Sequence, residues 1–315
     1  MASAKPDFAL PPQTVLHARY LLGDTLGGGA LGITYRAVQL DAPARGRVVA
    51  VKEFFPRALA VRAADGSVQP MPKGAADFAL YCARFVRGYR FLHAKANCPP
   101  LVPLLDLFEQ NGTAYVVMAY IEGETLAQRV KAHGAIPPRA LMRMMRPFLH
   151  DLAALHQRKI IHRAIMPRNS LLRGENPPLL LDFGGARPED DWPLRRCPVL
   201  RGRGYLPPEQ ICQSRQGSWT DVYALCATMY YALTAKEPAD ALERLFAAKT
   251  GKDEPLVPIR TLCPKLPRKQ ADALMAGLSL DSAARPADFA ALESALYGSK
   301  IPHFAFRIPN WCARK

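Results

Sequence analysis

Three separated groups of residues have the types and spacing to hold a magnesium-bound nucleotide. Residues 27–32 read GGGALG, and the missing side chains would let backbone N–H groups approach phosphates. Lys52 closes the apolar run "VVAVK", where a charge needs a counter-charge such as a phosphate. Asp182 follows the apolar run "PLLL" and would end a buried strand with a carboxylate suited to Mg²⁺.

The elements that must position these groups change from strands to helices along the chain. Residues 15 to about 121 predict mainly strands, because "YLLGDTLGGGALGITYRAVQL" and "RVVAVKEFF" have strand-like patterns, with one helix in "GAADFALYCARFVRGYRFLHAKA". After "EGETL" the patterns predict helices, including the apolar "TDVYALCATMYYALTA". A strand, "ITYRAVQL", follows the glycines, whereas a dinucleotide-binding fold needs a helix there. The pattern therefore favours a glycine flap over ATP phosphates.

Composition limits the classes of function. The 315 residues, 49% of them hydrophobic, predict a globular chain of about two domains or lobes. The seven cysteines include no CxxC pair, which argues against zinc and disulfides and for a reducing compartment. No apolar run approaches the ~20 residues that span a bilayer, so we expect a cytoplasmic protein without a membrane span. The net charge of +15 favours acidic partners, but no motif indicates nucleic acid.

The order of the motifs resembles the eukaryotic-like (Hanks-type) serine/threonine protein kinase family, and specifically its bacterial branch. The resemblance covers residues 15–297 and is carried by the glycine turn, "VAVK", "IIHRAIMPRNSLL", "DFG" at 182–184, "PPE" at 207–209 and "QGSWTDVYAL". It implies an α+β, bilobal protein kinase-like fold, with a small β-rich N-lobe at 15–121 and a larger α-helical C-lobe at 122–297. Residues 1–14 would be a loosely held extension and residues 298–315 a C-terminal tail.

The resemblance also implies ATP and Mg²⁺ as cofactors, bound between the lobes. The nucleotide-binding residues would be Gly27, Gly29, Gly32, Ala50, Lys52, Met118, Ala119 and Ile121. Among them, Met118 would be the gatekeeper, and backbone groups of Ala119 and Ile121 would meet adenine. Asn169 and Asp182 would hold the metal.

Several catalytic positions depart from the family pattern. HRDxKxxN becomes residues 162–169, with Ala164 in place of the aspartate that accepts the substrate proton. Met166 replaces the lysine that neutralises the transferring phosphoryl group. Gly88 stands where a helix glutamate would hold Lys52, and Gly202 replaces a threonine that would touch the catalytic pair. We therefore expect no catalytic residues at these positions.

The segment between Asp182 and Gly204 contains no serine, threonine or tyrosine, so phosphorylation of a hydroxyl cannot switch it. Arg163 remains as the would-be phosphate receiver. Four arginines, at 195, 196, 201 and 203, would form either a basic ledge for an acidic or phosphorylated protein partner or a solvated mobile loop.

Two internal braces are also implied by the resemblance. Glu209 would pair with Arg285, and Asp221 would be buried in its helix, supporting the catalytic loop from below.

The departures favour a native pseudokinase, because one laboratory mutation would explain Ala164 but not Met166, Gly88 and Gly202 as well. The predicted function is an inactive pseudokinase that binds ATP and Mg²⁺ and regulates or scaffolds protein partners. A low-activity kinase, a nucleotidyl transferase, an engineered inactive mutant of a serine/threonine kinase and an adaptor with an empty cleft stay open. Whether the chain is an enzyme is undecided by sequence, with the departures favouring no.

Overall fold

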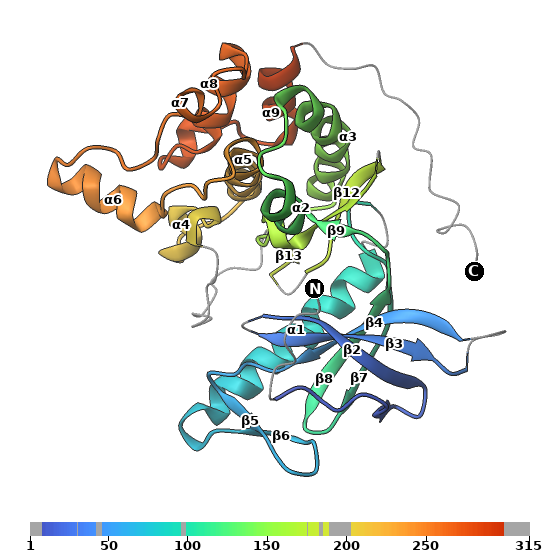
Figure 1. Ribbon diagram of the computed structural model, residues 1–315. Helices are drawn as coiled ribbons and strands as arrows, with labels where there is room; N and C mark the ends of the chain where they lie inside the picture. Colours follow the sequence, from blue (N-terminus) through green and yellow to red (C-terminus); the bar gives the residue numbers. More distant parts are fainter. Residues whose placement is uncertain are drawn as a thin grey trace. The chain divides into compact units, whose positions relative to one another are not determined.

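The computed structural model describes residues 8–29, 31–41, 46–95, 99–174, 176–182, 185–188 and 203–298. The chain divides into two units (Figure 1). Unit 1 is formed by Met1–Asn97, Val102–Glu122 and Cys197–Arg201, and unit 2 by Cys98–Leu101, Gly123–Arg196 and Gly202–Lys315. Within the described ranges, no helix has the length and apolar character needed to cross a membrane.

Unit 1 is built on a six-stranded antiparallel sheet with the strand order β1-β2-β3-β4-β8-β7. These strands are β1 (Val15–Leu16), β2 (Tyr20–Gly28), β3 (Gly32–Gln39), β4 (Arg47–Phe54), β7 (Leu104–Gln110) and β8 (Thr113–Ala119). A small hairpin of β5 (Ala60–Arg62) and β6 (Val68–Pro70) follows β4, and the short 3-10 helix η1 (Pro72–Gly74) leads into α1 (Ala75–Lys95).

Helix α1 packs on the sheet through the apolar face that its sequence period predicts. Phe78 and Phe85 both contact Phe54 of β4, with ring centroids 5.5 and 5.3 Å apart. Tyr89 and Leu92 continue the same face, and each is 1% exposed. The structure therefore confirms the helix predicted from this spacing, and the helix packs on β4, the strand that carries Lys52.

Unit 2 is mainly helical. Its helices are α2 (Leu126–His133), α3 (Pro138–Gln157), α4 (Pro208–Ile211), α5 (Ser218–Thr234), α6 (Ala241–Thr250), α7 (Ile259–Leu262), α8 (Arg268–Gly277) and α9 (Phe289–Tyr297), with 3-10 turns η2 (Pro167–Asn169), η3 (Arg203–Tyr205) and η4 (Ser282–Ala284). Helix α5 is buried over most of its length, as its continuous apolar sequence predicts. The change from strands to helices is thus confirmed, and the fold is α+β.

Short strands in unit 2 frame the catalytic-loop segment. Strands β12 (Asn176–Leu180), β11 (Ser170–Arg173) and β9 (Glu124–Thr125) form one sheet, while β10 (Ile160–Ile161) pairs with β13 (Arg187–Pro188). Residues 162–169 therefore run from the end of β10 to the start of β11, so both ends of the loop are fixed by strands.

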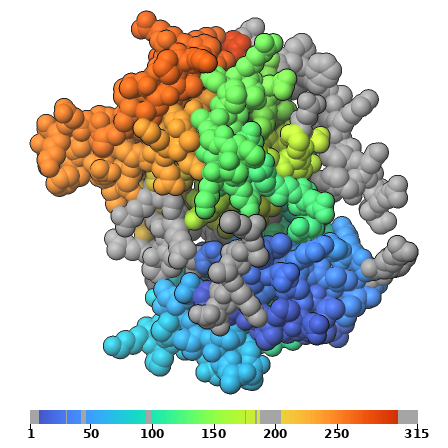
Figure 2. All heavy atoms as spheres, viewed as in Figure 1, coloured from blue at the N-terminus to red at the C-terminus, as the bar shows by residue number. Residues whose placement is uncertain are grey.

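Helix α6 projects from the rest of unit 2 (Figures 1 and 2), and Leu242 and Phe246 on it are 40% and 59% exposed. Its anchor is Arg244, whose guanidinium is buried and donates to Glu254 Oε1 at 2.8 Å and to the Leu278 carbonyl at 2.7 Å. One buried arginine therefore fixes a helix that exposes apolar side chains.

The N-terminal extension differs from its prediction. Leu10 is 3% exposed, and Gln13 donates its backbone N–H to the Leu22 carbonyl of β2 at 2.7 Å. In return, Leu22 donates to the Thr14 carbonyl at 2.9 Å. The expectation of a loosely held segment is therefore wrong for residues 8–14, because the burial of Leu10 and the backbone bonds to β2 hold them despite their proline-rich composition. Residues 1–7 and 299–315, which include almost all of the predicted tail, lie outside the described ranges.

Candidate nucleotide-binding site

The glycine turn joins β2 to β3, the strand–turn–strand arrangement predicted for it. Gly29 donates its N–H to the Gly32 carbonyl at 2.7 Å. A Cβ added at Gly32 would collide with the carbonyl oxygen of Glu53, so strand packing alone requires glycine there. By contrast, a Cβ at Gly27 would meet nothing within 4 Å, and one at Gly29 only the Gly32 carbonyl at 3.9 Å. Packing therefore leaves space at Gly27 and Gly29 that a phosphate could use.

Strand β4 presents Ala50 and Lys52 on one face of the sheet, because alternate residues of a strand point the same way. Ala50 pairs with Met118 of β8, and these two residues are 8% and 5% exposed. Lys52 is 8% exposed. Ala119, at the end of β8, donates its N–H to the Pro103 carbonyl at 2.9 Å, which excludes that N–H as an adenine contact. Ile121 follows two residues later.

Gly88 lies buried in α1, the helix that would supply a carboxylate to Lys52. The one acid in this helix is Asp77, in its first turn, eleven positions before Gly88. Glu53 is adjacent to Lys52 in sequence, but strand alternation directs its side chain to the opposite face. Neither acid therefore replaces the missing helix glutamate.

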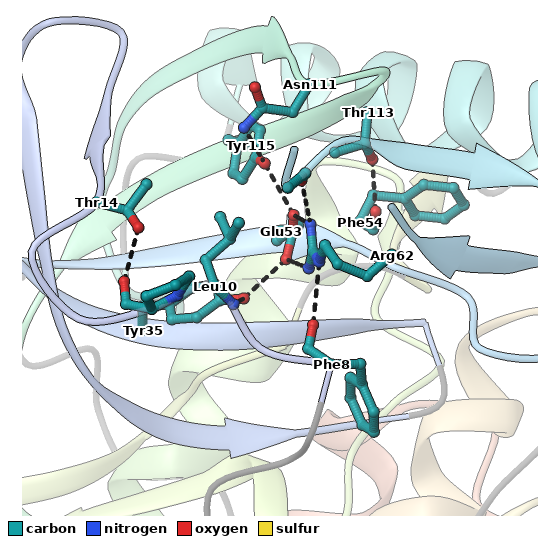
Figure 3. Close-up of polar contacts among 12 residues, drawn as sticks. Phe8, Leu10, Thr14, Tyr35, Glu53, Phe54, Arg62, Asn111, Thr113 and Tyr115 are labelled. Carbon is teal, nitrogen blue, oxygen red and sulfur yellow. Dashed lines mark hydrogen bonds and ion pairs between the residues drawn. The ribbon is translucent and has the colours of Figure 1, made fainter. Parts of the chain in front are cut away.

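The Glu53 carboxylate is instead the centre of a buried polar cluster that the sequence analysis missed (Figure 3). It is 0% exposed and accepts from Arg62 Nη1 at 2.7 Å and Nη2 at 2.6 Å. The hydroxyls of Tyr35 and Tyr115 each donate to it at 2.8 Å. We call Tyr35, Glu53, Arg62 and Tyr115 the Glu53 cluster.

Electrostatics of the Glu53 cluster favour neutral phenols and a charged guanidinium. Burial, and then the charge of Glu53, raise the pKa of both Tyr35 and Tyr115. Burial works against the charge of Arg62, but its hydrogen bonds to Glu53 outweigh this and raise its pKa. Four donors thus compensate one buried negative charge, which fixes strands β3, β4 and β8 to the β5–β6 hairpin.

In unit 2, the catalytic-loop segment keeps an ordered backbone around Ala164. Asn169 Nδ2 donates to the Ala164 carbonyl at 2.9 Å, and the Met166 carbonyl accepts from the Asn169 N–H and the Ser170 hydroxyl at 2.9 and 3.0 Å. The bond from Nδ2 fixes the orientation of the Asn169 amide. Asp182, two residues beyond β12, is half-buried. Met166 is 5% exposed, so its thioether is packed inside.

Asp221 supports this loop, as the family resemblance implied. Its carboxylate is 0% exposed and accepts from the backbone N–H groups of His162 and Arg163, both at 2.7 Å, and contacts His156 Nε2 at 2.9 Å. Arg163 has a φ of 65°, a left-handed conformation that these bonds stabilise. Burial opposes the charge of Asp221, but the bond and charge of His156 outweigh it and lower the pKa. The predicted brace is confirmed.

Arg163, the would-be phosphate receiver, is held by two buried amides. Its Nε donates to Gln216 Oε1 at 2.6 Å, and its carbonyl accepts from Gln210 Nε2 at 2.8 Å. Gln216 and Gln210 are 7% and 8% exposed. Gln216 therefore binds the guanidinium of Arg163, and Gln210 binds its backbone carbonyl.

The second predicted brace is also confirmed. Arg285 Nη1 and Nη2 donate to the two oxygens of Glu209 at 2.7 and 3.1 Å, and Thr220 Oγ1 donates to the same carboxylate at 3.0 Å. Because Arg285 lies between η4 and α9, this pair links α4 to the segment that precedes α9.

Several predicted residues lie outside the part of the chain that the structure describes. Phe183, Gly184, Gly202 and the arginines at 195, 196 and 201 lie outside the described ranges, as does the side chain of Arg203. The basic ledge therefore stays a prediction. The remaining site residues divide between the two units: the glycine turn, Ala50, Lys52, Met118, Ala119 and Ile121 in unit 1, and Ala164, Met166, Asn169 and Asp182 in unit 2.

A glycine flap between two strands, a strand lysine, and a braced loop with an oriented asparagine define the protein kinase class. The chain belongs to this family, since residues 20–272 match the protein kinase domain. It is 29% identical over 236 residues to the serine/threonine-protein kinase PknA of Nostoc sp., which covers 72% of this chain and 39% of that protein. Identity to the serine/threonine-protein kinase pkn2 of Myxococcus xanthus is 31% over 307 residues, covering 94% and 34%.

A solved structure and a third relative agree with this assignment. The structure titled "PpkA-294 apo form" matches with a TM-score of 0.75 and 26% identity, covering 92% of this chain and 100% of that one. The serine/threonine-protein kinase PknD of Mycobacterium tuberculosis is 30% identical over 232 residues, covering 73% of this chain and 32% of that protein. The bacterial Hanks-type resemblance and kinase fold are confirmed. The chain spans about a third to two fifths of these curated relatives, at 39%, 34% and 32%.

Proposed function

We propose that this kinase-family chain is a pseudokinase that binds ATP with Mg²⁺ and regulates or scaffolds protein partners in the cytoplasm. The observation that carries the proposal is the catalytic loop. Asp221 and Asn169 hold its backbone in order, yet it presents a methyl group at Ala164 and a buried thioether at Met166. The loop backbone is retained, while two of its charged side chains are replaced by uncharged ones.

The two substitutions act on the same chemical step. A general base typically contributes about 10²–10⁴ in rate, and Ala164 has no group that can accept a proton. A cation aimed at the developing phosphoryl charge adds further stabilisation, which the packed Met166 cannot supply. Together they would remove most of the rate that the loop gives an active kinase.

Nucleotide binding is supported by what each unit keeps. Protein kinases use ATP and Mg²⁺, and the open space at Gly27 and Gly29 leaves room for a polyphosphate beside the turn, where the Gly29 N–H already donates to the Gly32 carbonyl. Lys52 would pair with the phosphates, while Ala50 and Met118 would line the adenine site. Bound Mg²⁺ would offset phosphate charge, held by Asn169 Oδ1 and the Asp182 carboxylate.

Partner control would follow from this binding. A nucleotide that prefers one conformation shifts the population toward it, and a partner that recognises that conformation then binds better. The net charge of +15 favours an acidic or phosphorylated protein as that partner.

Calorimetric titration of the full chain with ATP, with and without Mg²⁺, tests nucleotide binding. We expect saturable binding that Mg²⁺ strengthens, and weaker binding by Lys52→Met and Asp182→Asn. The matched control is Asp281→Asn, which removes a carboxylate that only caps η4. No heat at millimolar ATP with Mg²⁺ would contradict the proposal.

The second candidate is a slow or atypical ATP-dependent transferase. It is favoured by the orientation of Asn169, because phosphoryl transfer depends more on metal placement and electrostatics than on the base. Incubation with γ-labelled and α-labelled ATP separates the outcomes. Label from the γ position on protein indicates a kinase, label from the α position indicates nucleotidyl transfer, and neither supports the pseudokinase.

A further inference from the structure

Residues Phe8 to Leu10 are built into unit 1 by aromatic and apolar contacts. The Phe8 ring stacks on Phe55, with centroids 5.6 Å apart and planes 9° from parallel. The guanidinium of Arg57 lies 3.9 Å from the centre of the same ring, within cation–π range. Leu10 is 3% exposed. The segment therefore packs in a defined position against residues that follow β4.

The backbone of this segment also completes the Glu53 cluster (Figure 3). The Phe8 carbonyl accepts from Arg62 Nε at 3.1 Å, and the Leu10 N–H donates to the Tyr35 hydroxyl at 3.1 Å. Tyr35 in turn donates to Glu53. Removing the segment would take a partner from a guanidinium and from a phenol, both largely buried, which is costly unless water or movement replaces it.

Residues next to this segment also contact the proposed phosphate-binding elements. The Phe55 N–H donates to the carbonyl of Leu31 at 2.9 Å, at the exit of the glycine turn. Gly32 lies directly against the Glu53 carbonyl, and Glu53 follows Lys52 in β4. Phe8 thus contacts Phe55, which is hydrogen-bonded at the exit of the glycine turn. Phe8 and Leu10 reach Glu53, the neighbour of Lys52, through Arg62 and Tyr35. Every one of these contacts lies within unit 1.

We propose that Phe8 and Leu10 are positioning residues for nucleotide binding, acting through Phe55 and the Glu53 cluster on the glycine turn and Lys52. The inference rests on the proposed function, because the ligand is ATP with Mg²⁺. With the segment seated, the exit of the turn and the end of β4 are held in one arrangement before the nucleotide arrives. A partner that withdrew the segment would therefore weaken nucleotide binding, and by reciprocity nucleotide would keep the segment seated.

The test compares ATP–Mg²⁺ affinity of the full chain by calorimetry in wild type, Phe8→Ala and Tyr35→Phe. Tyr20→Phe is the matched control, since Tyr20 donates to the Asp106 carboxylate at 2.7 Å in the same sheet. Phe8→Tyr keeps the ring and serves as the conservative rescue. We expect a loss of affinity of about threefold to tenfold in Phe8→Ala and Tyr35→Phe, the worth of one aromatic or hydrogen-bond contact. The control and the rescue should bind as wild type does.

A second readout separates this inference from the proposed function. Hydrogen exchange of the Phe55 amide, without nucleotide, should be about threefold to tenfold faster in Phe8→Ala and unchanged in Tyr20→Phe. If wild type binds no ATP, the proposed function fails and exchange at Phe55 alone decides the coupling. Unchanged exchange in Phe8→Ala, unchanged affinity where wild type binds, or equal losses in the Tyr20→Phe control would each overturn the inference.

Discussion

Removing one member of the Glu53–Arg62 pair should destabilise unit 1 far more than removing both. The carboxylate is 0% exposed and the Arg62 side chain 12% exposed, so either partner left alone keeps a largely buried, uncompensated charge. Breaking such a pair typically costs about 3–5 kcal/mol, whereas replacing both partners by neutral groups costs much less. We expect a loss of about 3–5 kcal/mol for Glu53→Gln and for Arg62→Met, but a loss of less than about 2 kcal/mol for the double variant, so the single losses should be far from additive.

Urea titration with pulse proteolysis provides the assay, because fragments identified by mass spectrometry report unit 1 and unit 2 separately. Arg19→Met with Asp41→Asn is the control cycle, since these side chains form a 2.6 Å pair but are 38% and 47% exposed. That cycle should give a much weaker coupling than the Glu53–Arg62 cycle, because water screens an exposed pair. A Glu53→Gln variant that loses less than about 1 kcal/mol, or additive single losses, would refute the reasoning.

Three further predictions concern single side chains. Burial raises the pKa of Asp151 to about 6 from its ordinary 3.8, so ionisation of Asp151 lowers native stability as the pH rises from about 4 to 6. Asp151→Asn should therefore stabilise the protein by about 1–3 kcal/mol at pH 7. Thermal unfolding near pH 4 should show no gain in stability, because the carboxyl is then protonated in the native protein. Gly32→Ala should cost about 1–3 kcal/mol in a denaturant titration because its Cβ would meet backbone, while Gly27→Ala should leave stability unchanged and weaken ATP binding. Gln216→Ala removes the acceptor of Arg163 Nε and should cost about 1.5–3 kcal/mol, measured by urea unfolding, with Gln157→Ala at the exposed end of α3 as control.

Features that follow from local pattern or from the family order could be predicted from the sequence. The buried α5 was predicted from its unbroken apolar run, and α1 from its helical spacing. The Asp221 brace and the Glu209–Arg285 pair were predicted because the kinase motifs carry them in a fixed order. In these cases the sequence neighbourhood and the tertiary contact agree.

The Glu53 cluster and the seat of Phe8 could not be predicted in the same way. Glu53 follows an apolar run, but its partners Arg62, Tyr35 and Tyr115 lie 9, 18 and 62 positions away along the chain. No periodicity connects such distant polar residues, and the proline-rich N-terminal composition hides the aromatic contact of Phe8. Similarly, sequence indicates that Met166 is uncharged but not that its side chain is buried.

The central claim is that the chain keeps a nucleotide site while lacking the charged groups that transfer phosphate. Its most direct test is the rate of γ-phosphoryl transfer from labelled ATP by the wild-type chain, on itself and on a generic protein substrate. The account predicts saturable ATP–Mg²⁺ binding with no transfer above that of the Asp182→Asn variant. Transfer by wild type at ordinary kinase rates, about 1–100 s⁻¹, would contradict it.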